Sequence, residues 1–256
     1  MTFDYIIIGA GSAGCVLANR LSEDPSTSVL LLEAGDKDSN FWIHVPVGFT
    51  KTLNNPEVNW NFATEPEDNV SGRSIPIPRG RVLGGSSSIN GMLYVRGQAF
   101  DYDVWGQLGN RGWSYSDILP YFQKSESFER GGDDYRGGSG PLNVDDMYER
   151  HELIEAFIDA GVEIGSRRNP DYNGAEQEGF GYYQITQRNG RRESTARAFL
   201  NPAKSRPNLT VISRAHATKI LTEGKRAVGV AFEVDGLPRK ERANAEVIVS
   251  AGAVQS

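Results

Sequence analysis

The hydrophobic pattern of the first 33 residues predicts a strand, a helix and a second strand. Residues 5–8 form an apolar run that ends at Gly9, which is typical of a strand buried on both faces. Residues 12–22 place apolar side chains at helical spacing, and residues 28–33 form another buried strand. Two strands joined by a helix within so short a segment predict a parallel sheet.

The rest of the chain alternates between loop-rich and regular segments. Residues 39–92 carry repeated prolines and clustered glycines, which predict long ordered loops, and such loops are usually functional. Helical pieces are predicted within residues 101–126. The clearest amphipathic helix covers residues 150–164, and we expect its apolar face to be core. Four further strands are predicted at residues 209–212, 216–221, 227–233 and 245–250.

Composition and charge narrow the class of protein. The chain has 256 residues, of which 38% are hydrophobic and 23% charged, as expected of a globular protein. A net charge of −6 makes nucleic acid a poor candidate partner. The single cysteine, Cys15, excludes an internal disulfide and a cysteine-rich zinc site, and we interpret it as a small buried hydrophobe.

Targeting and metal-binding signals are absent from the sequence. The three histidines lie far apart without metal-ligand spacing, so no metal site is expected. The sequence shows neither a secretory signal nor an apolar run of membrane-spanning length, and we expect a soluble cytoplasmic protein. Peripheral membrane association and the oligomeric state stay open.

The turn after the first strand carries a nucleotide-binding pattern. Residues 9–14 read G-x-G-x-x-G between a strand and a helix, so glycines allow a tight turn and close approach to a pyrophosphate. The helix N-terminus would present free N–H groups to the phosphates. Glu33 ends the second strand, where a carboxylate accepts hydrogen bonds from ribose hydroxyls and disfavours NADP. The pattern leaves NAD and FAD open.

A second motif favours the larger nucleotide. Residues 79–91 combine two arginines with two adjacent glycines, three serines and an asparagine. This concentration of backbone and hydroxyl donors suits the pyrophosphate and ribityl side of FAD, and an NAD-linked dehydrogenase would not need it.

The two motifs resemble those of the glucose–methanol–choline (GMC) oxidoreductases. "RGRVLGGSSSINGMLYVRG" is similar to a signature motif of that family, and "YIIIGAGSAGCVLANRLSEDPSTSVLLLEAG" is similar to its N-terminal FAD fingerprint. "STARAFLNPAKSRPNLTVISRAHATKIL" and "VIVSAGAVQS" also resemble the family, so the likeness runs along essentially the whole chain. The bacterial choline- and alcohol-dehydrogenase-type members are the most similar in appearance.

The resemblance implies an α/β fold with a Rossmann-like FAD-binding domain and the start of an α+β substrate domain. The implied division is a first FAD-binding part at 1–140 with wrapping loops at 39–97, a partial substrate-binding segment at 141–192, and a second FAD-binding part at 193–256. The residues assigned to FAD are Gly9, Gly11, Ser12, Ala13, Gly14, Glu33, Ala34, Arg79, Val82, Gly84, Gly85, Ser86, Asn90, Gly91, Met92, Leu93, Ala217, Ala251 and Gly252.

Individual roles follow from the same resemblance. The phosphates and the ribityl side would be lined by Arg79, Val82, Gly84, Gly85 and Ser86. Residues 90–93 would lie along the isoalloxazine, and Ala217 would meet the adenine through its backbone. Ile89 stands where some members carry a histidine bonded to the flavin, so FAD is expected to be non-covalent.

The implied reaction is oxidation of the CH–OH group of a small alcohol, with a quinone, a dye or oxygen as electron acceptor. The family's catalytic histidine pair is expected beyond Ser256, so the chain is expected to be truncated at the C-terminus. His44, His151 and His216 are interpreted as surface or loop residues, and Arg188, Arg191, Arg192 and Arg197 as a solvated face or an interdomain surface. A non-catalytic FAD-binding fragment and an NAD-dependent dehydrogenase remain alternatives.

Overall fold

The computed structural model describes residues 2–256, which form two compact units. The first unit comprises the chain up to Gly91 together with residues from Gly190 to Ser256, and the second comprises Met92–Asn189. The boundaries of these units differ from those of the expected functional parts, because residues 92–140 belong to the second unit. The functional division itself stays a prediction.

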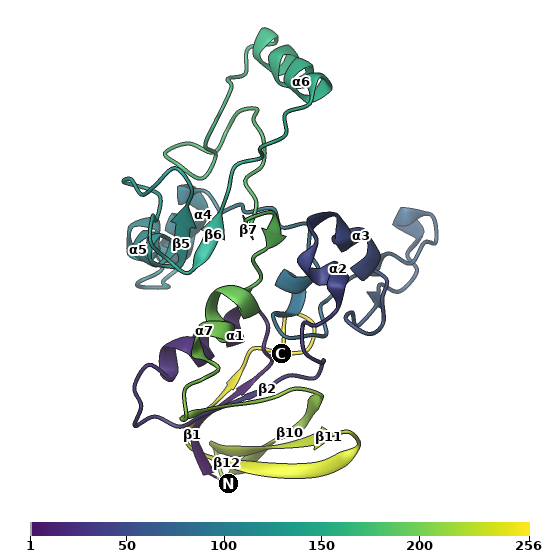
Figure 1. The fold of residues 1–256 in the computed structure, drawn as a ribbon, viewed down its shortest axis with the longest axis vertical. Helices are drawn as coiled ribbons and strands as arrows, with labels where there is room; N and C mark the ends of the chain where they lie inside the picture. The colour runs from purple at the N-terminus through teal and green to yellow at the C-terminus, as the bar shows by residue number, and fades with distance from the viewer. Residues whose placement is uncertain (1) are drawn as a thin grey trace. The chain divides into compact units, whose positions relative to one another are not determined.

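A six-stranded sheet forms the centre of the first unit, in the order β10-β11-β12-β1-β2-β9 (Figure 1). The strands β1, β2 and β9 and the end of β12 are parallel, whereas β10, β11 and the start of β12 are antiparallel. This mixed α/β architecture with a parallel centre confirms the predicted fold class. The strands are β1 (Thr2–Ile8), β2 (Val29–Leu32), β9 (Leu209–Ile212), β10 (Ala215–Glu223), β11 (Arg226–Val234) and β12 (Leu237–Val249).

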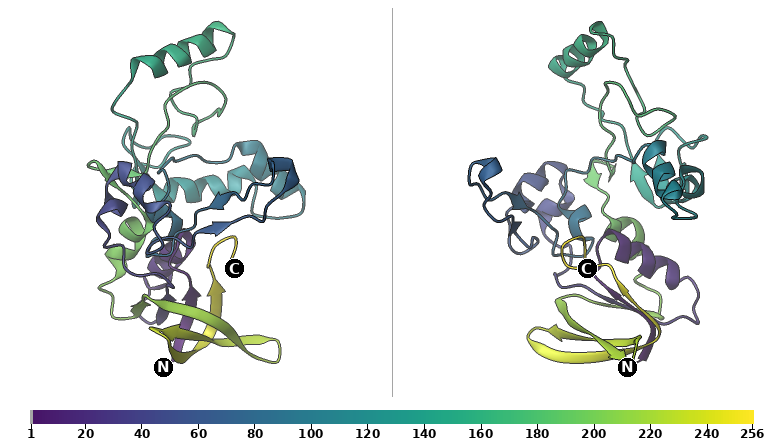
Figure 2. Two further views of the ribbon diagram at one scale, coloured as in Figure 1. Left: turned by 90° about the vertical axis from the view of Figure 1, so that its right-hand side faces the viewer. Right: turned by 180° about the vertical axis from the view of Figure 1, so that it is seen from behind.

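The long strand β12 joins the two halves of the sheet (Figure 2). Its first part pairs with β11, with Val230 opposite Glu241, and its last part pairs with β1, with Ile6 opposite Val247. Ile6 also lies opposite Leu30 of β2. The apolar cluster on this sheet comprises Phe3, Ile6, Leu30, Leu32, Ala215, Val230, Phe232 and Ala243.

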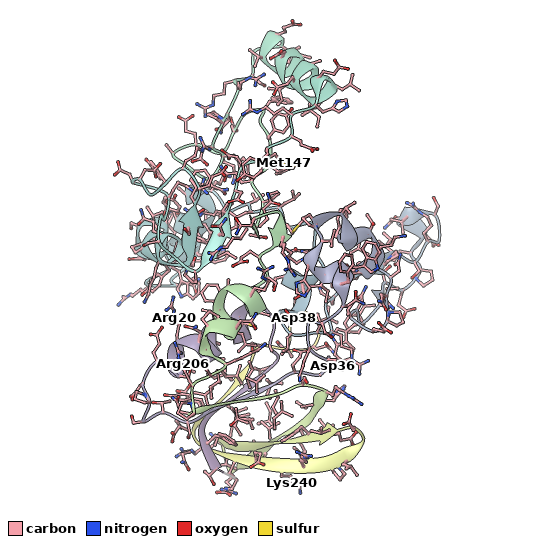
Figure 3. All side chains as sticks on the ribbon, in the orientation of Figure 1. Arg20, Asp36, Asp38, Met147, Arg206 and Lys240 are labelled. Atoms are coloured by element: carbon pink, nitrogen blue, oxygen red, sulfur yellow. The ribbon has the colours of Figure 1, made fainter. Side chains whose placement is uncertain are left out.

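The predicted first helix is α1 (Ser12–Leu21), which packs against β1 and β2 and against the π-helical turn η4 (Ala196–Leu200). Asn19 holds η4 because its amide nitrogen donates to the Phe199 carbonyl at 2.7 Å. After η4 comes the short helix α7 (Asn201–Ala203). Arg206 follows it and donates to Ser22 Oγ at 2.8 Å, at the C-terminal end of α1 (Figure 3).

The segment between β2 and Gly91 contains only short elements, as its prolines and glycines predict. Its apolar centre consists of Ile43, Val58, Val82 and Ile89. The elements are α2 (Phe41–His44), η1 (Pro46–Gly48), α3 (Phe49–Thr52), β3 (Phe62–Ala63), η2 (Asp68–Val70), β4 (Pro76–Ile77) and η3 (Gly85–Ser88).

The second unit contains three helices of about three turns and a pair of short parallel strands. The helices are α4 (Ala99–Gln107), α5 (Tyr115–Ser125) and α6 (Glu152–Glu163), the paired strands are β5 (Glu126–Phe128) and β6 (Leu142–Val144), and the unit ends with β7 (Gln187–Arg188). The chain then returns to the first unit at β8 (Arg191–Arg192).

The apolar face of α6 departs from expectation. Ile158 is buried, but Leu153 and Phe157 are 70% and 65% exposed. The prediction that this whole face is core is therefore wrong for this chain. Gly161 packs closely on Phe180, where a Cβ would lie 2.7 Å from the ring, but Phe157 meets that ring only edge-on, with centroids 5.6 Å apart, and stays mostly exposed. Within residues 2–256, no helix is both long and apolar enough to cross a membrane.

Candidate functional site

The glycine turn between β1 and α1 brings three backbone segments close together. Gly9 has a φ of +94°, and a Cβ there would lie 2.6 Å from the Ser250 carbonyl oxygen. A Cβ on Gly14 would lie 1.9 Å from the Gly9 carbonyl oxygen. Only glycine fits such approaches, so these positions hold the start of α1 against the ends of β1 and β12.

The N-terminus of α1 is not capped by a side chain. Gly11 is the N-cap residue and offers no side-chain acceptor to the first turn. The first N–H groups of a helix have no partner within the helix, and they carry partial positive charge. The turn therefore presents donors suited to an anionic group.

Glu33 is buried directly beside this turn, at 5% exposure. Its Oε2 accepts a hydrogen bond from the Ala10 N–H at 2.8 Å, and its Oε1 accepts one from the Gly35 N–H at 2.8 Å. Burial raises the pKa of Glu33, and the two backbone hydrogen bonds and the charge of Arg81 oppose that shift. Since each carboxylate oxygen can accept a second bond, Glu33 both fixes the turn and can accept further donors.

The segment from Arg79 to Asn90 folds back onto the glycine turn. The Gly84 N–H donates to the Ala10 carbonyl at 2.8 Å. A Cβ on Gly85 would lie 2.7 Å from Gly11 Cα, and Gly85 has a φ of +53°. Two glycine-rich segments far apart in the sequence thus meet backbone to backbone, which their glycines permit.

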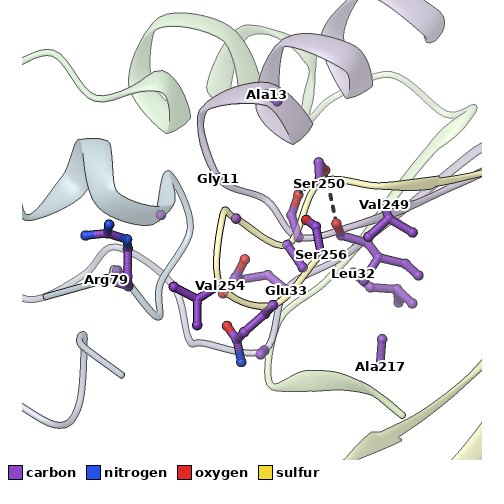
Figure 4. Close-up of a pocket in the computed structure, with 18 of the residues that line it drawn as sticks. Gly11, Ala13, Leu32, Glu33, Arg79, Ala217, Val249, Ser250, Val254 and Ser256 are labelled. Atoms are coloured by element: carbon purple, nitrogen blue, oxygen red, sulfur yellow. Dashed lines mark hydrogen bonds between the residues drawn. The ribbon is translucent and has the colours of Figure 1, made fainter. Parts of the chain in front are cut away.

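These segments line a cavity of about 760 Å³ in the first unit (Figure 4). Its size lies within the ordinary range of ligand pockets. The residues assigned to FAD by sequence that line it are Gly9, Gly11, Ser12, Ala13, Glu33, Ala34, Arg79, Gly85, Ser86, Ala217, Ala251 and Gly252. They come from both ends of the chain, and the sheet brings them together.

The other assigned residues do not line this cavity. Gly14 is buried against the Gly9 carbonyl, and Val82 and Gly84 are buried within the segment from Arg79 to Asn90. Asn90 and Gly91 are exposed at the end of that segment, and Met92 and Leu93 belong to the second unit.

An aromatic group on the cavity wall was not assigned by sequence. Trp60 stacks on Phe62, with ring centroids 5.9 Å apart, and meets the His216 ring edge-on at 5.8 Å. All three side chains line the cavity. The run Asn59-Trp60-Asn61-Phe62 was part of the family resemblance, but Trp60 comes beside His216 of β10 only in the folded chain.

The histidines occupy three different settings. His44, on α2, has Nε2 at 2.6 Å from the Asp38 carbonyl oxygen. His151 caps α6 through Nδ1, which accepts from the Leu153 N–H at 3.2 Å. His216 lies on a strand and lines the cavity. Cys15 is fully buried, and burial raises the pKa of its thiol to about 12, consistent with a structural role.

The interpretation of the arginine cluster as a solvated face or an interdomain surface is wrong for Arg192. Arg191 is exposed, whereas Arg192 has no exposed surface. Its guanidinium extends between α2 and the segment at residues 87–90, donating to the Ile43 and Ser87 carbonyls. Local composition could not reveal this, because the acceptors lie 149 and 105 residues away.

The residues of the cavity fit a dinucleotide with an adenosine half. The uncapped helix supplies anion-binding donors, the glycines leave room where a Cβ would clash, and the buried Glu33 supplies acceptors. Within residues 2–256, no cluster of three or more His, Cys, Asp or Glu side chains is arranged to hold a metal ion.

A parallel-centred α/β sheet with this glycine turn defines a dinucleotide-binding protein of the Rossmann type. A family model described as GMC oxidoreductase matches residues 3–256, and the chain belongs to this family of FAD-dependent oxidoreductases. The oxygen-dependent choline dehydrogenase of Photobacterium profundum is 50% identical over 258 residues, which cover 100% of this chain and 45% of that protein. The Pseudomonas putida protein named alcohol dehydrogenase [acceptor] is 47% identical, covering 99% of this chain and 47% of that protein.

Solved structures agree with this assignment. Pyridoxine 4-oxidase from Mesorbium loti has a TM-score of 0.95 and 33% identity, covering 99% of this chain and 50% of that one. An FAD-dependent oxidoreductase from Chaetomium thermophilum has a TM-score of 0.88 and 31% identity, covering 98% of this chain and 45% of that one. The chain therefore spans about half the length of the proteins it matches.

Proposed function

We propose that this chain is the FAD-binding part of a flavoenzyme that oxidises the CH–OH group of a small alcohol. The observation that carries the proposal is the cavity in which the uncapped N-terminus of α1, the buried Glu33 and the segment from Arg79 to Ser86 meet. The family and its FAD-dependent structural neighbour support the choice of cofactor.

Each part of the cavity has a proposed partner on the cofactor. The N–H groups after Gly11, together with Gly85 and Ser86, bind the pyrophosphate. Glu33 accepts hydrogen bonds from the adenosine ribose, and Ala217 contacts the adenine through its backbone. Residues 90–93 lie along the isoalloxazine; this last assignment rests on the family resemblance alone.

FAD is proposed to be held without a covalent bond. Ile89, at the position where some family members carry a flavin-linked histidine, is 2% exposed and packs with Ile43, Val58 and Val82. An aliphatic side chain has no nucleophile with which to bond the flavin.

The substrate class follows from the relatives. The choline and alcohol dehydrogenases that match the whole of this chain favour choline or another small alcohol as the substrate, with oxygen, a quinone or a dye as electron acceptor. Bound FAD would supply the acceptor for the hydride of the alcohol carbon. The base that removes the hydroxyl proton is proposed to lie outside these 256 residues. His44 and His151 each hydrogen-bond to the backbone of their own segment, and His216 packs edge-on against Trp60.

Two alternatives make different predictions. An NAD-dependent dehydrogenase would not need residues 79–86 against the glycine turn, and the packing of Gly85 on Gly11 therefore disfavours it. A non-catalytic FAD-binding fragment would bind the flavin, but no alcohol would reduce it.

The experiment is flavin analysis followed by anaerobic reduction. Acid precipitation of the purified yellow protein should release FAD into the supernatant; colour that stays with the pellet would overturn the non-covalent assignment, and a colourless protein would overturn FAD binding. Choline and an alcohol series should bleach the flavin in the protein extended to its relatives' length, but not in residues 1–256. Bleaching in the shorter chain would place the base within it.

A further inference from the structure

Arg192 is a buried cation without a counter-charge. Its side chain has no exposed surface, and within residues 2–256 no carboxylate forms an ion pair with it. Burial lowers the pKa of this guanidinium to about 10, with no acidic neighbour to oppose the shift. Burying a charge without a partner is costly, so an arginine at such a position calls for a physical explanation.

Two of its three hydrogen bonds go to residues 87–90, directly after the cavity residues Gly85 and Ser86. Nη1 donates to the Ser87 carbonyl at 3.1 Å and to Asn90 Oδ1 at 2.8 Å, while Nε donates to the Ile43 carbonyl at 2.8 Å. A guanidinium can only donate. The oxygen of the Asn90 carboxamide must therefore face Arg192, and the amide nitrogen must point away from it.

The residues that follow Arg192 hold the other end of the same segment. The Thr195 N–H donates to Ser87 Oγ at 3.0 Å, and Ser87 Oγ donates to the Gly84 carbonyl at 2.6 Å. Gly85, between these anchors, lines the cavity and packs on Gly11. Residues 192–195 thus hold the 84–90 segment through hydrogen bonds to Ser87 and Asn90.

One guanidinium nitrogen of Arg192 stays unsatisfied. Nη2 is buried without a partner in the structure. An apolar side chain of similar size would avoid this cost but could not orient Asn90 or bind the Ser87 carbonyl. Arg192 therefore costs the protein some stability, and in return it fixes the geometry of residues 84–90.

We propose that Arg192 is a positioning residue of the flavin site, which orients the Asn90 carboxamide and fixes the course of residues 84–90. The inference rests on the proposed function, because it is FAD that this segment would contact. Arg192 acts through Asn90 and Ser87 and does not itself need to touch the flavin.

The test uses two substitutions at this site and one matched control. Arg192→Gln removes the charge and the fork of donors, and Arg192→Lys keeps the charge but has only one nitrogen. Arg191→Gln changes the adjacent exposed arginine. The measurements are the FAD dissociation constant, the visible circular dichroism of bound flavin, and hydrogen exchange of residues 84–90 in the flavin-free protein.

The expected result is that Arg192→Gln and Arg192→Lys both raise the FAD dissociation constant by about tenfold or more, as for lost hydrogen bonds to a charged group. Both should also change the visible circular dichroism and speed exchange at 84–90, while Arg191→Gln changes none of these. Wild-type affinity and dichroism in a folded Arg192→Gln variant would overturn the proposal. Full rescue by lysine would also overturn it, because charge alone would then suffice.

A further variant covers the case in which Arg192→Gln does not fold. Asn90→Ala removes the exposed acceptor and leaves Arg192 in place, and it should reproduce the change in flavin dichroism; an unchanged spectrum would overturn the orienting role. A wild-type protein that binds no flavin would overturn the proposed function instead, and hydrogen exchange of the flavin-free protein would still test whether Arg192 fixes residues 84–90.

Discussion

The central sheet of the first unit is held by apolar side chains, whereas the interior of the second unit is arranged around one carboxylate and two arginines. Ile6 and Leu30 lie opposite each other on adjacent strands and are fully buried. In the second unit, the fully buried Glu126 forms ion pairs with both Arg96 and Arg136.

Arg136 and Glu126 make further contacts with the residues around them. Arg136 also pairs with Asp171, donates to Gln184 Oε1 at 3.0 Å, and has its guanidinium carbon 3.7 Å from the centre of the Phe128 ring. The Gly137 N–H donates to Glu126 at 2.9 Å. Such a network joins loops that have little regular structure, through directional bonds that an apolar core cannot provide.

The apolar interior of the first unit and the ionic interior of the second should respond differently to amino-acid substitutions. An apolar core loses stability in proportion to the volume removed and tolerates substitutions that keep its volume. A buried ion pair loses much stability with a single substitution, because removing one partner leaves the other charge buried and unpaired. We therefore expect the second unit to depend on single residues more strongly than the sheet does.

Glu126→Gln should have the largest effect, a loss of about 3–5 kcal/mol in the free energy of unfolding, because two arginines lose their shared counter-ion. Hydrogen exchange should speed up in residues 126–145 and stay unchanged in β2. Asp235→Asn, which breaks the exposed Arg214–Asp235 pair, is the control and should change stability little. Equal stability of the two variants would contradict the ionic description of this interior.

Leu30→Ala should cost about 2–5 kcal/mol, the range for a leucine removed from a packed core. Here exchange should speed up in β1, β2 and β9, with the second unit unaffected. Leu237→Ala, at a position that is 64% exposed on β12, should change the free energy of unfolding by about 0.5 kcal/mol or less. A Leu30 variant that destabilised both units equally would show that they unfold as one.

The smallest expected effect is that of replacing Glu33. This buried carboxylate of the first unit accepts its hydrogen bonds from backbone N–H groups, whereas Glu126 accepts from arginines. Glu33→Ala should weaken FAD binding by about 1.5–3 kcal/mol, because charge-assisted hydrogen bonds to the ribose are lost. Titration with FAD measures this, with the exposed Glu23→Ala as the matched control from the same unit. Unchanged affinity in a folded Glu33 variant would refute the placement of the adenosine ribose.

The local pattern of the chain was sufficient for much of the fold. The prediction of a strand at 28–33 agrees with β2 at Val29–Leu32, and the helix expected at 12–22 agrees with α1 at Ser12–Leu21. The glycine spacing from Gly9 to Gly14 also predicted the tight turn. Such features depend on neighbours within a few residues, so periodicity and steric freedom reveal them.

The environment of individual side chains was decided by the tertiary structure. Arg192 shares its local composition with exposed Arg191, yet the carbonyls that receive it come from Ile43 and Ser87. His216 faces the cavity only because β10 joins the sheet beside Trp60. Hydrophobic periodicity in the sequence defines which elements form. The burial of Arg192 and the setting of His216 depend on segments more than a hundred residues away, which no local pattern encodes.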